Sequence, residues 1–216
     1  MSFVTFRRAL TPNSRYIDLC FMPKEKPPTD RILDATVVML RRHGVDKTNV
    51  VDVARALGMS HGNIYRHFSS KQALINAVAA RWLRAVLDPL EAIASNHSRA
   101  ASKRLAAWFD TLREIKQRKV VDDPELFRVH HQIVSRIPEV VAEHVAELLR
   151  QVESIIEDGI KAGEFSPRLD PPVAARAFLQ ATSPFHHPTL LLQNPPPSEA
   201  EARAVFKLLL AGMKAQ

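Results

Sequence analysis

Cysteine and long apolar segments are what this sequence has least of, and both shortages exclude whole classes of protein. Cys20 is the only cysteine, so neither an internal disulfide framework nor a cysteine-based zinc site can form within one chain. This usage suits a reducing cytoplasm. No apolar run approaches the roughly 18 residues that a membrane-spanning helix needs. Arg7 and Arg8 are followed by neither a sustained apolar segment nor a small-residue cleavage site, which argues against a secretory signal.

Glycine is also scarce, with six in 216 residues, whereas hydrophobic residues make up 46% of the chain. The length allows one or two compact domains with a buried core. Apolar residues recur at helical rather than alternating spacing, so we expect an all-α protein of about nine helices. Lysine and arginine number 30 against 23 aspartates and glutamates, and the net charge of +7 favours anionic partners, nucleic acid before an acidic membrane surface.

No arrangement of side chains in the sequence points to catalysis or to a bound metal. An enzyme needs a nucleophile with its base, or a metal centre, and we find neither pattern. His130 and His131 are adjacent, as are His186 and His187, and neighbouring side chains on a helix point about 100° apart, so neither pair chelates one ion unaided. Hydrogen bonding to a ligand, or a place at the rim of a dimer interface, fits these histidines better. We predict no enzyme, no cofactor and no metal.

The segment over residues 48–71 carries the most specific pattern in the chain. Asn49 can cap a first short helix and Gly58 can end it. Ser60 can cap a second short helix. The apolar face of the first helix has the spacing i, i+3, i+4 and i+7 and consists of Val50, Val53, Ala54 and Leu57. Two short helices joined by a glycine-containing turn form a helix-turn-helix, whose second helix enters the major groove of DNA.

The second of these helices has Ile64 and Phe68 as inward anchors and polar residues elsewhere. The run GMSHGNIYRHFSSKQAL, with VVDVARAL before it, resembles the DNA-binding domain of the TetR/AcrR family of transcriptional regulators. The string Y-x-H-F-x-S-K at this distance from the turn glycine is far more specific than a helix-turn-helix pattern alone. The resemblance covers roughly residues 29–82 and is carried by Gly58, Ser60, Ile64, Tyr65, His67, Phe68, Ser70, Lys71 and Leu74.

This resemblance implies which side chains meet DNA. His61, Asn63 and Tyr65 would face the groove, where an asparagine can both donate to and accept from an adenine edge. Gly62 would let the backbone approach closely, and phosphate contacts are implied for several neighbours, Tyr65 among them. The complete predicted DNA-binding set is Thr48, Ser60, His61, Gly62, Asn63, Tyr65, Arg66, His67 and Lys71.

Several of these residues also have a purely structural interpretation. Tyr65 could pack inside a core, His67 could cap the end of its helix, and Arg66 could simply point into solvent. Val51 stands where many members of the family carry a polar or basic residue. We therefore expect the first helix of the pair to contribute little to base recognition.

Helices are predicted along most of the remaining chain. Pro89 would either kink the helix that begins near Lys71 or end it and start another. The proline-rich stretch 183–197 is predicted to be a loop, which is long for a helical bundle. The spacing of apolar residues, with prolines at helix starts and glycines at helix ends, places the helices at residues 30–43, 71–94, 102–119, 123–135, 138–162, 172–182 and 198–214.

We divide the chain into an N-terminal arm, a DNA-binding domain and a second helical domain, over residues 1–28, 29–75 and 76–216. The arm lacks periodicity and ends in two prolines, so we expect it to be flexible. Met22 begins a run that resembles a usual start for the family, which would make residues 1–21 an upstream extension. A basic arm beside a helix-turn-helix can alternatively reach phosphates or the minor groove.

The resemblance also implies a dimer and a ligand pocket in the second domain. Core packing is the alternative role for every residue concerned. The last two helices are the family's dimer elements, and the apolar residues that would pair there are Phe178, Val205, Phe206, Leu209 and Met213. The apolar candidates for a pocket among the preceding helices are Trp82, Trp108, Phe109, Phe127, Val134 and Phe178.

The resulting prediction is a cytoplasmic, sequence-specific DNA-binding regulator of transcription. We expect a homodimeric repressor that binds a palindromic operator in double-stranded DNA, has no membrane partner, and is released by a small molecule of unknown identity. Such a ligand acts only through its different affinities for two states of the protein. The alternative is an architectural protein that coats DNA without sequence preference and without an inducer.

Overall fold

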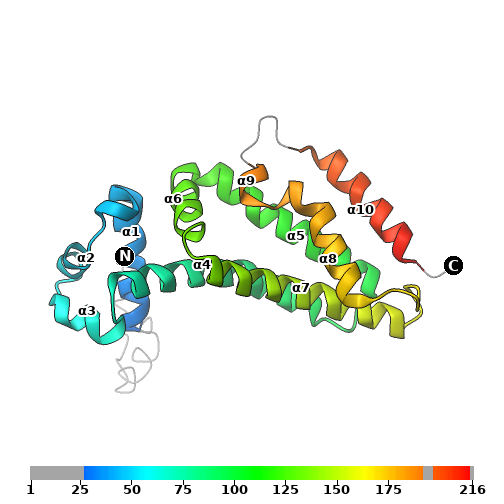
Figure 1. Cartoon of the computed structure of the whole chain (residues 1–216), viewed down its shortest axis with the longest axis horizontal. Helices are drawn as coiled ribbons and strands as arrows, with labels where there is room; N and C mark the ends of the chain where they lie inside the picture. The colour runs from blue at the N-terminus through cyan, green and yellow to red at the C-terminus, as the bar shows by residue number, and fades with distance from the viewer. Residues whose placement is uncertain (1–26, 192–196, 215–216) are drawn as a thin grey trace, which may run out of the picture.

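The computed structural model describes residues 27–191 and 197–214, and its elements are helices (Figure 1). Within these residues the one extended pairing is an isolated bridge between Phe165 and Lys214, which confirms the all-α prediction. A short 3-10 helix, η2 (Ser183–Phe185), precedes α9. The α-helices are α1 (Pro28–Lys47), α2 (Val50–Ala56), α3 (His61–His67), α4 (Lys71–Ala94), α5 (Ala101–Asp122), α6 (Pro124–Val134), α7 (Pro138–Lys161), α8 (Pro171–Thr182), α9 (Pro188–Leu191) and α10 (Glu199–Met213).

The molecule is elongated, with α1, α2 and α3 at one end and α10 at the other (Figure 1). The long helix α4 leaves the first group and runs along the molecule, where it packs against α5 and α7 (Figure 1). α7 packs against both α4 and α8, and α6 packs against α1. None of the helices in the described part of the chain is both long enough and apolar enough to cross a bilayer.

Buried side chains form two clusters, which we call the N-terminal core and the C-terminal core. α4 supplies Leu74 and Val78 to the first and Val86 and Leu90 to the second, so a boundary at residue 75 passes through this helix. The N-terminal core is centred on Ile32, Leu40, Val53, Ile64, Phe68, Leu74 and Val78, joined by Val129, Ile133 and Ile137. The C-terminal core is centred on Leu105, Trp108, Phe109, Val152, Ile155 and Phe178.

Helix ends follow the capping residues that the sequence provides. Side-chain oxygens of Asp123 and Asp170 accept from backbone N–H groups in the first turns of α6 and α8, each of which also has proline at its first position. Ser198 and Glu201 form a reciprocal capping box at the start of α10. Gly163 has φ 71° just beyond α7, a left-handed backbone that glycine adopts without steric cost.

Two helical segments differ from the expectations in detail. α4 continues through Pro89, which lies on its exposed side. The helix therefore does not end at this proline and start again. The stretch 183–197 is not a loop throughout, because η2 and α9 lie within it. The predicted arm falls almost wholly outside the described residues, as do residues 192–196 of the proline-rich stretch.

Candidate nucleic-acid interface and ligand cavity

The α2–turn–α3 unit is fixed by local hydrogen bonds. Asn49 Oδ1 accepts from the backbone N–H of Asp52 at 2.8 Å, which caps α2. Ser60 Oγ accepts from the backbone N–H of Asn63 at 3.2 Å, which caps α3. Gly58, between the helices, has φ 63° and so turns the chain where a side chain would be strained. The sequence therefore determines this turn without help from distant residues.

α3 separates its residues cleanly into an inner and an outer surface. Ile64 is fully buried in the N-terminal core and Phe68, its C-cap, is buried there as well. Tyr65 is 46% exposed, which excludes the alternative in which it packs inside a core. Its ring meets that of His61 edge-on, with ring centroids 6.4 Å apart. The exposed residues of this helix are His61, Gly62, Tyr65, Arg66 and His67, and Asn63 is half-buried beside them.

Thr48 and Lys71, at the two ends of the predicted set, are placed differently from α3. Thr48 is buried, and its hydroxyl donates to the backbone carbonyl of Gly44 at 2.7 Å. That hydroxyl is thus occupied inside the protein, so we drop Thr48 from the proposed phosphate contacts. Lys71 is half-buried, and its Nζ donates to the backbone carbonyl of Asp46 at 3.3 Å. Ser70, just before it, caps α4 through the N–H of Ala73.

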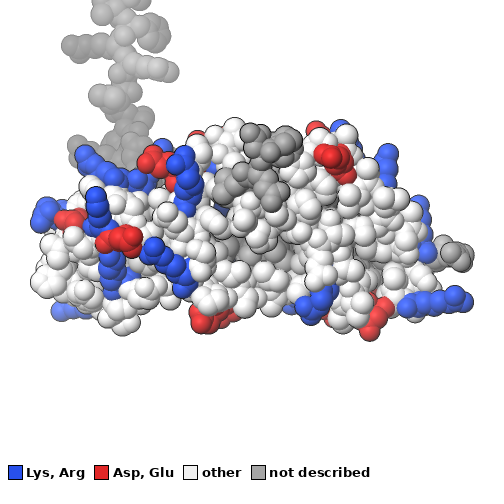
Figure 2. Space-filling model, turned by 45° about the horizontal axis from the view of Figure 1, so that its top comes forward, with Lys and Arg blue, Asp and Glu red and all other residues white. Residues whose placement is uncertain are grey.

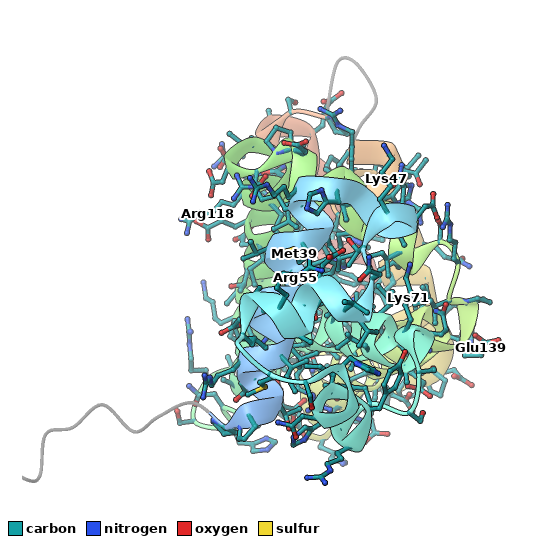
Figure 3. The ribbon with its side chains drawn as sticks, turned by 90° about the vertical axis from the view of Figure 1, so that its left-hand side faces the viewer. Met39, Lys47, Arg55, Lys71, Arg118 and Glu139 are labelled. Carbon is teal, nitrogen blue, oxygen red and sulfur yellow. The ribbon has the colours of Figure 1, made fainter. Side chains whose placement is uncertain are left out.

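Basic residues outside the predicted set lie on the same end of the molecule. Figure 2 shows Lys and Arg side chains gathered over this end, with some acidic side chains among them. Lys47 and Arg55 appear on the end-on face in Figure 3, together with Lys71 of the predicted set. Arg55 is held by Asp52 at 3.0 Å, a short-range pair on α2. Lys47 and Arg55 cannot be assigned from the sequence, because isolated basic residues on a helix surface carry no specific signal.

The predicted aromatic pocket residues divide between core and cavity. Trp108 Nε1 donates to Gln151 Oε1 at 2.9 Å deep in the C-terminal core. Phe109 stacks on Phe206 with centroids 5.7 Å apart and meets Phe178 edge-on at 6.1 Å. Trp108, Phe109 and Phe178 therefore fill the core rather than line a cavity, because their rings pack against one another. Trp82 and Phe127 line a small cavity of about 210 Å³ instead.

A larger cavity of about 560 Å³ lies among α4, α5, α6, α7, α8 and α9, and we call it the central cavity. Val134 lines it, as predicted for a pocket residue. Its apolar walls come mostly from α7 and include Val141, Val145, Leu148 and Leu149. The lysine, arginine and histidine side chains that line it are Lys116, His130, His131, His144, Arg176, His186 and His187. This size suits a small organic molecule.

Burial controls the protonation of this lining. Burial, followed by the charges of Lys119 and Lys116, lowers the pKa of His130 to about 3. The pKa of His144 is lowered to about 3 by burial and then by Lys116, and that of His186 to about 4 for the same two reasons. Burial and the nearby Lys119 lower the pKa of Lys116 to about 8. At neutral pH these histidines are uncharged, whereas Lys116 is mostly protonated.

Comparisons with known proteins agree with the residues that carry the helix-turn-helix. A sequence-family model for bacterial regulatory proteins of the tetR family matches residues 32–78, and one for the C-terminal domain of tetracyclin repressor-like proteins matches residues 101–206. The chain belongs to the TetR family of transcriptional regulators. These two matches lie on either side of the middle of α4, the helix that both cores share.

Relatives of this TetR-family chain include both regulators and repressors. It is 35% identical over 71 residues to the transcriptional regulator YvdT of Bacillus subtilis, covering 32% of this chain but only 37% of YvdT. It is 27% identical over 159 residues to the transcriptional repressor KstR2 of Rhodococcus jostii, covering 70% of this chain and 74% of KstR2. The structure of FadR from Bacillus subtilis in complex with stearoyl-CoA superposes with a TM-score of 0.61 at 20% identity, covering 85% of this chain and 98% of FadR.

The predicted dimer residues of this TetR-family chain are not all on its surface. Phe178 and Met213 are buried within the chain, because they pack in the C-terminal core, whereas Val205, Phe206 and Leu209 are half-buried. The exposed apolar residues are their neighbours, led by Val173 at 64% and Leu208 at 74% exposure. They form one stripe on each helix, Val173, Ala177 and Ala181 on α8 and Ala204, Leu208 and Ala211 on α10.

Proposed function

We propose that this TetR-family regulator is a homodimeric repressor that binds a palindromic operator and leaves it when a small molecule occupies the central cavity. The observation that carries this proposal is the exposed polar surface of α3, held over Ile64 and Phe68 in the N-terminal core. A helix fixed from behind in this way can enter a groove without rearranging the protein. The repressor KstR2 of Rhodococcus jostii, to which the chain is similar, supports this direction of control.

In the proposed complex α3 lies in the major groove. His61 and Asn63 read base edges, Tyr65 and His67 contact phosphates beside them, and Gly62 allows close backbone approach. Ser60 caps the helix and Arg66 adds positive charge next to the phosphates. Lys71 leaves its weak bond to the Asp46 carbonyl to reach a phosphate, as its half-buried position allows.

A second copy of the chain would supply the second half-site. Recognition helices of helix-turn-helix dimers lie about 34–36 Å apart, one turn of DNA, so symmetric dimers read palindromes. The exposed stripes on α8 and α10 suit such pairing, because their small side chains permit close helix approach and only Val173 and Leu208 project far. These residues, rather than the buried Phe178 and Met213, form the proposed dimer surface.

α6 offers a route from the central cavity to α3. His130 and Val134 line the cavity, while Val129 and Ile133, on the same helix, belong to the N-terminal core. α6 also packs on α1. A ligand that shifts α6 must therefore change the packing under the helix-turn-helix, which is how a difference in ligand affinity would become a difference in DNA affinity. FadR from Bacillus subtilis in complex with stearoyl-CoA is a related fold that holds a ligand.

Selection of bound sequences from the DNA around the regulator's own gene tests this proposal and identifies the operator. We expect enrichment of a two-fold symmetric site. Tyr65→Phe and Lys71→Ala should each weaken binding to it by about tenfold in a gel shift, with unchanged circular dichroism. Losing the Lys71 contact in both copies should lower the slope of log affinity against log salt by about two.

The matched control is Lys103→Ala, because Lys103 is an exposed lysine on α5, away from α3. This variant removes the same charge and should leave affinity and salt slope unchanged. Equal losses in all three variants would mean that binding follows overall charge alone. Equal competition by unrelated DNA would point to the architectural alternative.

The dimer is tested separately by light scattering at micromolar concentration. Leu208→Glu places a charge in the middle of the exposed stripe of α10 and should yield a monomer with weak operator binding. Lys207→Glu, one position along the same helix and also exposed, is the matched control and should remain dimeric. A wild-type monomer, or a Leu208→Glu dimer as stable as wild type, would contradict the proposed surface.

A further inference from the structure

The lining of the central cavity is unbalanced in charge. Lys116 on α5 and Arg176 on α8 contribute cationic side chains, and histidines come from α6, from α7 and from the residues between η2 and α9. Within the described part of the chain, no aspartate or glutamate lines this cavity. Much of the remaining lining is aliphatic, with Leu148, Leu149 and Leu179 among its residues. A ligand that matches this lining must be apolar over most of its surface and negatively charged at one point.

Lys116 is the centre of the imbalance. The residue is buried, and no hydrogen bond or ion pair joins its ammonium to another of the described residues. Placing an unpaired ammonium away from water is unfavourable unless an opposite charge meets it. Lys119, one turn along α5, differs in this respect, because its Nζ donates to the backbone carbonyl of Trp82 on α4 at 3.4 Å. The chain thus leaves Lys116 without the kind of partner that it gives its neighbour.

Buried imidazole nitrogens without partners stand beside this lysine. His130 Nε2 and both ring nitrogens of His144 are buried and make no hydrogen bond within the described residues. Both histidines lie close enough to Lys116 for its charge to lower their pKa values. A neutral imidazole has one N–H donor, so the two rings and Lys116 together can donate to the oxygens of one carboxylate. Buried polar groups of this kind are rarely left unsatisfied in a working protein.

A metal ion fits these groups poorly. Histidine, cysteine, aspartate and glutamate side chains form no group of three or more suited to a metal over residues 27–191 and 197–214. The cationic Lys116 and Arg176 would also repel a cation that entered the same space. An anion gains from both features, because the lysine attracts it and the rings donate hydrogen bonds to it.

We infer that the central cavity binds an amphipathic organic acid, with its carboxylate held by Lys116, His130 and His144 and its aliphatic body against Leu148, Leu149 and Leu179. This inference names the chemical class of the ligand in the proposed function and depends on that function only for the effect on DNA. The ligand neutralises the buried lysine and satisfies the two rings in a single step, so binding also stabilises the folded protein.

Calorimetric titration of the full chain tests the ligand class directly. The probes are straight-chain carboxylates of eight to sixteen carbons, with decan-1-ol and decyltrimethylammonium as uncharged and cationic counterparts of decanoate. At least one carboxylate should bind with 1:1 stoichiometry per chain. Decanoate should bind at least about tenfold more tightly than decan-1-ol. Equal affinity for the alcohol, tighter binding of the cation, or no binding by any carboxylate overturns the inference.

The matched pair of variants is Lys116→Met and Lys119→Met, which remove equal charges from neighbouring turns of α5. Lys116→Met should lose about tenfold or more in decanoate affinity while its melting temperature rises, because an unpaired buried charge has gone. Lys119 lines the small cavity rather than the central one, so Lys119→Met should keep its affinity within about threefold. Similar losses in both variants would show that general positive charge, not the Lys116 site, attracts the acid.

Gel shifts with and without the acid separate this inference from the proposed function. Tight binding of decanoate by a protein that ignores operator DNA supports the cavity assignment and removes the repressor proposal. If the protein binds its operator but binds carboxylates no more tightly than the matching alcohols, the repressor proposal stands and the cavity assignment is wrong. Release of the operator at acid concentrations near the calorimetric Kd supports both.

Discussion

The two candidate sites of this regulator are built in opposite ways. α3 presents its polar side chains from seven consecutive residues, and two of its neighbours cap it or anchor it. The central cavity draws its lining from Leu83 to Pro188, through helices that meet only in the folded chain. The first site is a property of a short segment, whereas the second is a property of packing. That difference explains why one can be recognised in a sequence and the other cannot.

The sites also treat polar groups differently. On α3 the polar residues face water, where they lose little hydration until DNA arrives. In the cavity His130 Nε2 and both ring nitrogens of His144 have lost water without gaining a partner, and the buried Lys116 also has no partner within the described chain. Removing a polar side chain should therefore cost DNA affinity but little stability at the first site. At the second it should change affinity and stability together.

The largest expected effect lies behind the exposed site. Ile64→Ala should destabilise the protein by about 2–5 kcal/mol, because the fully buried side chain leaves a cavity under α3. Urea denaturation measures the change. The control, Arg66→Ala, alters an exposed residue on the same helix and should stay within about 0.5 kcal/mol of wild type. Comparable losses in the two variants would mean that α3 is not anchored as the structure has it.

A smaller effect distinguishes two glycines in the C-terminal half. A Cβ at Gly159, on α7, would lie 2.1 Å from a ring carbon of Phe165, so Gly159→Ala should destabilise by about 1–3 kcal/mol. Gly212, on α10, has nothing within 4 Å of such a Cβ. Gly212→Ala should stabilise the protein by up to about 1 kcal/mol through helix propensity. Thermal unfolding measures both variants. A shift of the melting temperature in the same direction for both would contradict the different packing of the two glycines.

The smallest effect concerns the buried histidines and pH. Burial, with Lys119 and Lys116 on α5 and His131 and His144 nearby, holds the pKa of His130 well below its unfolded value. The unfolded chain therefore binds more protons, and the stability conferred by the neutral ring is complete above about pH 6.5 and declines as the pH falls toward 3.

The unfolding free energy of the wild type should fall between pH 7 and pH 5.5, and in His130→Phe this fall should be smaller by about 1 kcal/mol. Urea denaturation at both pH values measures it. The aromatic replacement preserves the edge-on contact of His130 with Trp82. An unaltered dependence in His130→Phe would mean that the pKa of this ring is the same in the folded and the unfolded protein, which would contradict its burial.

Local chemistry was enough to predict the helix-turn-helix and most helix ends. Asn49, Gly58 and Ser60 act within four residues of where they stand, so their roles are legible in the sequence. The continuation of α4 through Pro89 was left open, because whether a helix survives a proline depends on packing on either side. α9 was missed because four residues inside a proline-rich stretch carry no periodicity.

The lining of the central cavity, in contrast, could not be predicted from local sequence. Aromatic residues were the natural pocket candidates, yet Trp108, Phe109 and Phe178 pack against one another in the core. The adjacent histidines suggest hydrogen bonding to a ligand or a place at a dimer rim, and their spacing alone does not decide between the two. Lys116 and His144 were not singled out, because a lysine or histidine on an amphipathic helix usually faces solvent. Nothing local marks these two as buried, since burial is decided by helices far away in the chain.

α6 has a consequence for how this architecture can be recombined. Val129 and Ile133 belong to the N-terminal core although they follow the DNA-binding segment by dozens of residues. A chimera that joined these first helices to the C-terminal half of a relative would place the relative's α6 side chains in the core that supports the helix-turn-helix. Such a chimera should fold only when the sixth helix of the relative is complementary in shape to α1. The two domains can therefore be exchanged only together with a compatible α6.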